Sequence, residues 1–192
     1  MILLRLLLAF ALMGFAGLGI VAWLHPRRAL CWSEIAGQSV FFGSAAISLL
    51  LAALSPWCGG ALLVGGVGAI AVASGGLGLR RVGLGREPLP RGLAIAVAVA
   101  TLLVCWQALA QPLAGDGLFN FEIRAQLGWQ QGGRMPFSFF GDPSRAWMHS
   151  SYPLFISFDQ LWLYLCMGER SHRVDLAEPC KWMVACQFTQ RR

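Results

Sequence analysis

Four residues of this sequence combine the side chains needed for group transfer near a phosphate: Asp116, Arg124, His149 and Tyr152. A carboxylate such as that of Asp116 can take a proton from an acceptor hydroxyl or amine, or hold a divalent cation. Arginine and histidine can bind a phosphate through charge-assisted hydrogen bonds. The segment 116–152 is therefore the part of the chain where we look for chemistry.

Long stretches without charge surround this segment. Residues 6–24, 35–79 and 92–115 contain no charged side chain, and the whole chain of 192 residues is 57% hydrophobic and 12% charged. Soluble domains are nearer to 25% charged. A membrane-spanning helix needs about 20 apolar residues, and a charge at its centre costs roughly 2.5–3.5 kcal/mol. We therefore expect an all-α integral membrane protein.

Breaks in the apolar stretches divide them into four or five spans. Residues 35–79 are too many for one span, and the sequence SPWCGG at 55–60 supplies a proline and two glycines that end a helix and permit a turn. The predicted spans are listed in chain order: 6–24, 36–55, 60–79, 92–111 and a short fifth one at 153–168 that carries Asp159. Glycines between 59 and 78 would let the third span pack closely on its neighbours.

The chain then divides into four parts. Residues 1–111 form a four-span region, and 112–152 form a partly helical loop that carries the candidate site. Residues 153–168 form the fifth span, and 169–192 form a tail that is cytoplasmic or the product of a shifted reading frame. The charge content rises abruptly in this tail, and the apolar pattern stops there.

The positive charge does not indicate nucleic-acid binding. The net charge is +6, but the arginines lie in short loops beside apolar spans, and no basic face with interleaved aromatic residues is present. The six cysteines form no CxxC pair and no zinc-ligand spacing. We expect these cysteines to be unpaired and structural.

The arginine loops also predict the orientation. Arg27 and Arg28 follow the first span and Arg80 to Arg91 follow the third, so both loops lie on one side. Cytoplasmic loops are enriched in Lys and Arg. The turn at 55–60 and the loop 112–152 are then extracytoplasmic, in a bacterial inner membrane, and so is the N-terminus, although Arg5 does not favour that side.

The start of the loop has the pattern of a short amphipathic helix. Phe119, Ile123 and Leu127 recur every four residues, whereas Arg124 lies on an adjacent strip. We expect the Gly132-Gly133 pair to end this helix. A simpler interpretation of these residues remains open: Asp116 starts a helix, as Asp often does, and the arginines of the loop contact lipid headgroups.

The loop resembles the first external loop of bacterial polytopic glycosyltransferases of the GT-C type, the relatives of protein O-mannosyltransferases and aminoarabinose transferases that use polyprenyl-phosphate sugars. The resemblance is carried by Asp116 to Ala125, Gly132-Gly133, Asp142-Pro143 and the run from His149 to Leu154. It covers roughly 40 residues closely and stops where the tail at 169–192 begins, so we favour a shifted reading frame as the interpretation of that tail. Gly115 stands where an aromatic residue is common, and Ser150-Ser151 stand where Pro-Asp is frequent.

The resemblance implies an enzyme that moves a sugar from a polyprenyl-phosphate carrier to an extracytoplasmic acceptor. Asp116 would be the catalytic carboxylate, with or without a divalent cation, and Arg124 and His149 would bind the donor phosphate. Tyr152, Asp142 and Arg145 would bind substrate. Enzymes of this type usually have about eight or more spans, so the chain would correspond to the N-terminal part of one.

Two other functions remain open. The chain could be a non-catalytic membrane subunit that assembles with other membrane proteins, or a degenerate fragment without activity. A transporter fits less well, because transporters keep polar residues at mid-membrane and the first four spans contain almost none.

The predicted orientation can be tested by labelling. We expect cysteines introduced as Arg86→Cys and Arg134→Cys to react from opposite sides of the membrane with an impermeant thiol reagent. Labelling of position 86 from outside would invert the orientation and remove the candidate site from external acceptors.

Overall fold

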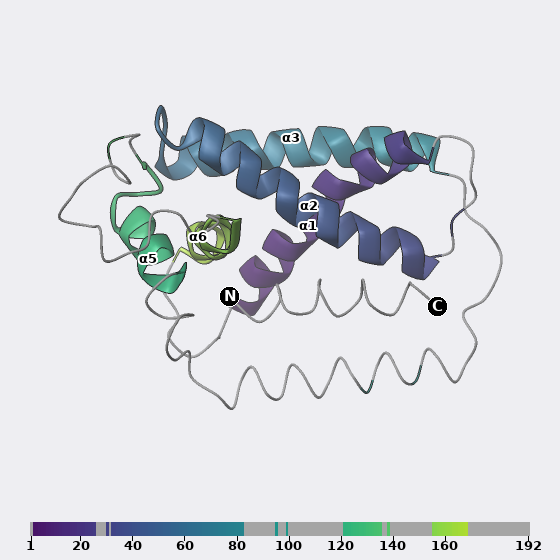
Figure 1. The fold of residues 1–192 in the computed structure, drawn as a ribbon, viewed down its shortest axis with the longest axis horizontal. Helices are drawn as coiled ribbons and strands as arrows, with labels where there is room; N and C mark the ends of the chain where they lie inside the picture. The colour runs from purple at the N-terminus through teal and green to yellow at the C-terminus, as the bar shows by residue number, and fades with distance from the viewer. Residues whose placement is uncertain are drawn as a thin grey trace.

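A computed structural model shows a helical protein and describes residues 2–25, 30, 32–82, 95, 99, 121–135, 138 and 155–168. Within these residues the elements are five helices and no strand (Figure 1). They are α1 (Ile2–Leu24), α2 (Trp32–Leu54), α3 (Gly60–Arg81), α5 (Ile123–Gln130) and α6 (Phe155–Met167). The prediction of an all-α fold is confirmed for this part of the chain.

Three of the helices are long and apolar enough to cross a membrane. Helices α1 and α2 have 23 residues each and α3 has 22. At 1.5 Å per residue they measure about 33–35 Å, and the hydrocarbon core of a bilayer is about 30 Å thick. They coincide with the predicted spans at 6–24, 36–55 and 60–79. Of the predicted fourth span, 92–111, only Ile95 and Val99 are described, so that span stays a prediction.

The turn between α2 and α3 lies where proline and glycine predicted it. Helix α2 ends at Leu54, and the amide of Cys58 donates to the carbonyl oxygen of Leu54 at 3.0 Å. Gly60 then starts α3 with a φ of +56°, a conformation that side chains with a Cβ rarely adopt. The charge-free block therefore forms two antiparallel helices.

Helix α1 packs against both α2 and α3, and at several points its backbone touches theirs. A Cβ added to Gly17 would overlap the carbonyl oxygen of Ser39, and one added to Gly43 would overlap that of Met13. On the α3 side, a Cβ at Gly78 would meet the Leu18 backbone at 2.8 Å. The predicted close packing through glycines of the third span is therefore confirmed at Gly78. The contact between α1 and α2 uses Gly17 and Gly43, which lie outside residues 59–78.

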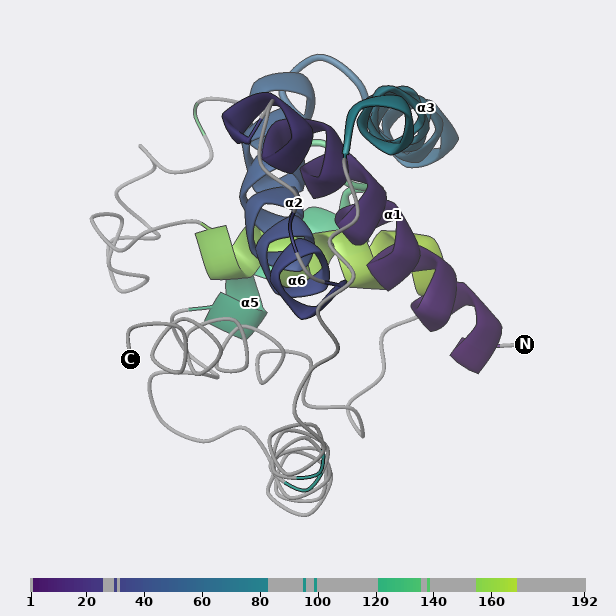
Figure 2. The same ribbon diagram turned by 90° about the vertical axis from the view of Figure 1, so that its right-hand side faces the viewer.

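Helix α6 lies across the three long helices instead of alongside them. In Figure 1 α3 extends across the view and α6 is seen end-on, whereas Figure 2 shows α3 end-on and α6 lengthwise. Both ends of α6 are held near one end of the bundle. Nη1 of Arg5 donates to the Met167 carbonyl oxygen at 2.8 Å, and Oγ of Ser48 donates to that of Phe155 at 3.1 Å. Arg5, which fitted the predicted orientation poorly, thus has a structural partner.

The length of α6 bears on the predicted fifth span. Its 13 residues measure about 20 Å, less than the hydrocarbon thickness. Ser48, which holds its first residue, lies within the last two turns of α2. Passage of 153–168 to the other side of the membrane stays a prediction, and the described helix does not by itself cover that distance.

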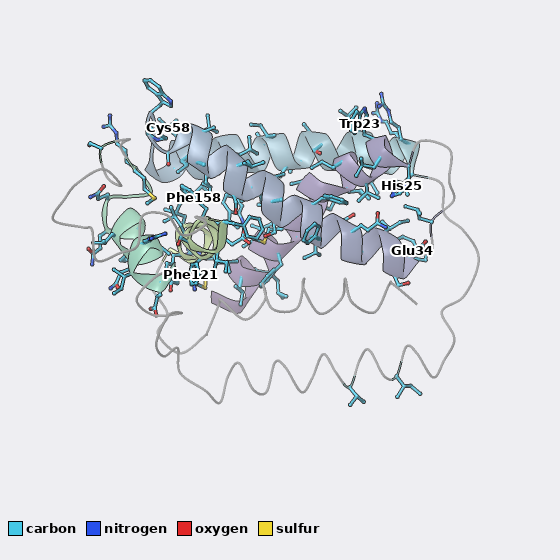
Figure 3. The ribbon with its side chains drawn as sticks, in the orientation of Figure 1. Trp23, His25, Glu34, Cys58, Phe121 and Phe158 are labelled. Carbon is cyan, nitrogen blue, oxygen red and sulfur yellow. The ribbon has the colours of Figure 1, made fainter. Side chains whose placement is uncertain are left out.

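Helix α5 lies at the same end of the bundle as the α2–α3 turn. After α5, the amide of Met135 donates to the Ser55 carbonyl oxygen at 3.0 Å, and the amide of Gly60 donates to that of Gly132. Gly132 and Gly133 have φ angles of +65° and +85°, so they end the helix as predicted. In Figure 3 Cys58, Phe121 and Phe158 lie toward this end, and Trp23, His25 and Glu34 lie toward the other.

The backbone contact between α1 and α2 predicts a specific sensitivity to an added methyl group. Gly43→Ala should destabilise the protein by about 1–3 kcal/mol, the usual cost of overpacking, because the new Cβ forces the helices apart. The unfolding midpoint in detergent micelles measures this effect. Gly14→Ala is the matched control, since a Cβ there meets nothing within 4 Å. Equal midpoints for the two variants would contradict the close contact.

Candidate functional site

Of the residues predicted to form the site, only Arg124 belongs to the described part of the chain. Asp116, Asp142, Arg145, His149 and Tyr152 lie outside it, so their predicted roles stay predictions.

Arg124 is buried completely where α5 meets the bundle. Its exposed fraction is 0%, and Ala125 and Gly128 are the other buried residues of α5. The apolar strip that carries Ile123 and Leu127 is only half-buried. The side of α5 that packs most deeply is therefore the one that carries the arginine.

Gly128 explains why this side of α5 is buried. It lies one helical turn after Arg124, and a Cβ added there would lie 3.1 Å from Cδ2 of Leu161 on α6 and 2.9 Å from Sδ of Met135. A glycine thus lets α5 approach α6 closely. The apolar pattern of a sequence shows where large hydrophobic side chains recur. A glycine adds nothing to that pattern, so the pattern does not predict this close contact.

The buried guanidinium keeps its charge and suits an anionic ligand. Burial lowers the pKa of Arg124 from its usual value, but arginine remains protonated in proteins. Its planar fork of N–H donors matches the oxygens of a phosphate and can bind them in pairs. Glu122, two residues earlier, is also buried, at 5% exposed.

A second polar cluster joins α6 to α2, and the sequence did not predict it. Asp159, 2% exposed, accepts hydrogen bonds from the hydroxyls of Ser44 and Ser48, the latter at 2.9 Å from Oδ1. The signal was present in the sequence: one carboxylate in an apolar stretch, and two serines four residues apart that share a helix face. The apolar spans are therefore less uniformly non-polar than we expected.

The cluster fixes how α6 is rotated. With Asp159 directed at α2, Trp162 is directed at α1, where its indole N–H donates to the carbonyl oxygen of Ala9 at 3.3 Å. A carboxylate is costly in an apolar environment unless it is hydrogen-bonded, so this rotation is favoured over others. Within the described residues, no three His, Cys, Asp or Glu side chains converge to hold a metal ion.

An apolar groove lies between the three long helices. It has a volume of about 380 Å³ and is lined by residues of all three: Ala16, Ile20, Ala46, Leu49, Leu50, Ile70 and Ser74. Its lining carries no charged group, so it suits a hydrocarbon chain better than a polar molecule.

Comparison with known proteins assigns no relative. No protein-family model matches the chain, and neither does a curated protein or a solved structure. The function must therefore be inferred from the residues and their arrangement.

The Asp159 cluster predicts an energetic coupling between α2 and α6. Ser44→Ala should destabilise the native protein, because a buried carboxylate loses a donor. The same change in an Asp159→Leu background should cost close to nothing. We expect a coupling of about 0.6–1.7 kcal/mol, the range found for hydrogen bonds between membrane helices, from unfolding midpoints of the four proteins. Ser39→Ala, a buried serine of the same helix without a hydroxyl partner in the described structure, is the control. Additive effects of the two changes would contradict the interaction.

Proposed function

We propose that this chain is a glycosyltransferase-like membrane protein that moves a sugar from a polyprenyl-phosphate carrier to an extracytoplasmic acceptor. The observation that carries the proposal is Arg124, a fully buried cation on a short helix fixed at the end of three helices of membrane-spanning length. The phosphate of a lipid-linked sugar lies at the membrane surface. An arginine at the end of the helices is well placed to bind it.

Two contacts support a fixed position for this arginine. The segment after α5 is hydrogen-bonded to the α2–α3 turn through Met135 and Gly132, and α5 packs on α6 through Gly128. A ligand that binds to α5 would therefore meet a positioned donor and not a mobile side chain, which lowers the entropy lost on binding.

The distribution of arginines supports the extracytoplasmic side. Arg80 and Arg81 end α3, at the opposite end from the turn that contacts α5. If the end with Arg80 and Arg81 is cytoplasmic, as the positive-inside rule favours, α5 faces outward. A bacterial inner membrane is the compartment that fits polyprenyl-phosphate donors.

The reaction needs one proton transfer and one substitution. The carboxylate of Asp116 would take the proton of the acceptor hydroxyl as the acceptor oxygen bonds to the anomeric carbon. The bond between that carbon and the phosphate oxygen would break, and polyprenyl phosphate would leave with the electron pair. Arg124 and His149 would stabilise the charge on the departing phosphate, while Asp142, Arg145 and Tyr152 would hold the substrates.

The apolar groove supports the same proposal from the lipid side. A polyprenyl chain needs an apolar surface in the bilayer, and the groove between α1, α2 and α3 provides one without a charged residue. It lies along the membrane-length helices whose end holds α5.

The proposal predicts which variants lose transfer. In proteoliposomes that contain the full chain and polyprenyl phosphate carrying a radiolabelled sugar, with an added alcohol or water as the acceptor hydroxyl, Asp116→Asn should slow loss of label from the lipid by about 10²–10⁴, the usual contribution of a general base. Asp175→Asn, in the tail, is the matched control. Arg124→Lys keeps the charge but loses the paired donors, so it should weaken donor binding, whereas the exposed Arg134→Lys should not.

Two outcomes would argue against the proposal. Equal rates for Asp116→Asn and the unchanged protein would remove this carboxylate from the chemistry. Absence of both turnover and lipid binding in the unchanged, correctly inserted protein would favour the alternative of a subunit or fragment without activity of its own.

A further inference from the structure

Four consecutive residues of α6 identify its four sides. Successive residues of an α-helix are about 100° apart. Asp159 faces α2 through Ser44 and Ser48, Leu161 faces α5 at Gly128, and Trp162 faces α1 at Ala9. Gln160 lies between Asp159 and Leu161 around the helix, so it defines a fourth side, between the side that faces α2 and the side that faces α5. Ser157 lies three residues before Gln160 and four before Leu161, so it adds a second polar group between the Gln160 side and the α5 side.

Two polar side chains on this fourth side, those of Ser157 and Gln160, make no hydrogen bond within the described structure. Gln160 is 0% exposed and Ser157 is 3% exposed. Within the described structure, neither the amide oxygen nor the amide nitrogen of Gln160 makes a hydrogen bond, and neither does the Ser157 hydroxyl. Buried polar side chains are almost always hydrogen-bonded, and an exception calls for a ligand or water that completes it. Asp159 and Trp162, on two other sides of the same helix, are hydrogen-bonded, so among the described residues of α6 the exception is confined to Ser157 and Gln160.

The chemistry of the strip selects a neutral, hydroxyl-rich ligand. A primary amide both donates and accepts hydrogen bonds, and so does a hydroxyl. Sugar hydroxyls have the same dual character. Neither Gln160 nor Ser157 carries charge, so the strip has no preference for phosphate. The phosphate would instead be bound by Arg124, which lies on the buried side of the neighbouring helix α5.

We propose that the Ser157–Gln160 strip of α6 binds the sugar of the lipid-linked donor, next to an arginine that binds its phosphate. This inference rests on the proposed function and adds the element that recognises the sugar. The orientation of α6 follows from the same contacts: with Asp159 bonded to α2 and Leu161 against α5, the strip occupies the side of the helix between those two neighbours.

The test separates sugar binding from lipid binding. The full chain, in lipid nanodiscs, is titrated with bare polyprenyl phosphate and with polyprenyl phosphate carrying mannose, glucose or aminoarabinose. We expect the unchanged protein to prefer at least one sugar-bearing form. Gln160→Met keeps the length of the side chain but removes its hydrogen bonds, so it should reduce that preference by roughly tenfold and leave the affinity for bare polyprenyl phosphate unchanged.

A matched pair of serines provides the second measurement. Ser157→Ala and Ser39→Ala each remove a buried hydroxyl that has no partner in the described residues, but only Ser157 lies on the strip. Ser157→Ala should lower the preference several-fold and Ser39→Ala should not. The unfolding midpoint without ligand should stay equal or rise in Gln160→Met, because an unsatisfied buried amide is removed.

The outcomes distinguish the inference from the function on which it rests. A sugar preference that survives in Gln160→Met and Ser157→Ala would overturn the inference alone. A clear fall in the ligand-free midpoint of Gln160→Met would also overturn it, since the amide would then serve the fold. Failure of the unchanged protein to bind either kind of lipid would overturn the proposed function and this inference together.

Discussion

The rest of the described structure depends on the backbone contact of α1 with α2 and α3. Gly17 and Gly43 bring α1 and α2 together, and Gly78 brings α3 against the other side of α1. In a bilayer, burial of apolar surface gives helices little reason to associate, so close contact through small residues is a main source of stability. The groups that hydrogen-bond to α6 lie on α1 and α2, namely Ala9, Ser44 and Ser48. These hydrogen bonds can form together only while α1 and α2 keep their spacing.

The parts of the fold that the sequence predicted are those determined by solvent and chain stereochemistry. Exclusion of charge marks the three long helices, proline with glycine marks the turn between α2 and α3, and a pair of glycines marks the end of α5. These signals act locally, so each can be recognised in a short window of sequence. All but two residues of the predicted fourth span, and five of the six predicted site residues, lie outside the described part, so these predictions are untested.

The parts that the sequence did not predict depend on contacts between distant residues. Asp159 lies 115 positions after Ser44, and neither residue indicates in the sequence that it will contact the other. The buried side of α5 was also missed, because Gly128 allows contact by having no side chain. The polar strip at Gln160 could be recognised only after the neighbours on the other three sides of α6 were known. Pairing across such separations is set by the packing of the whole bundle.

The bond between Arg5 and the end of α6 has a consequence for biogenesis. It joins residues 162 positions apart, so the guanidinium leaves the ribosome long before the Met167 carbonyl oxygen that it binds. Because chains fold from the N-terminus during synthesis, α1, α2 and α3 can associate first and form the surface on which α6 packs. Helix α6 then docks as a late step, with a cation already in place for the negative end of its dipole. Assembly of the site would be the last event in the maturation of the described structure.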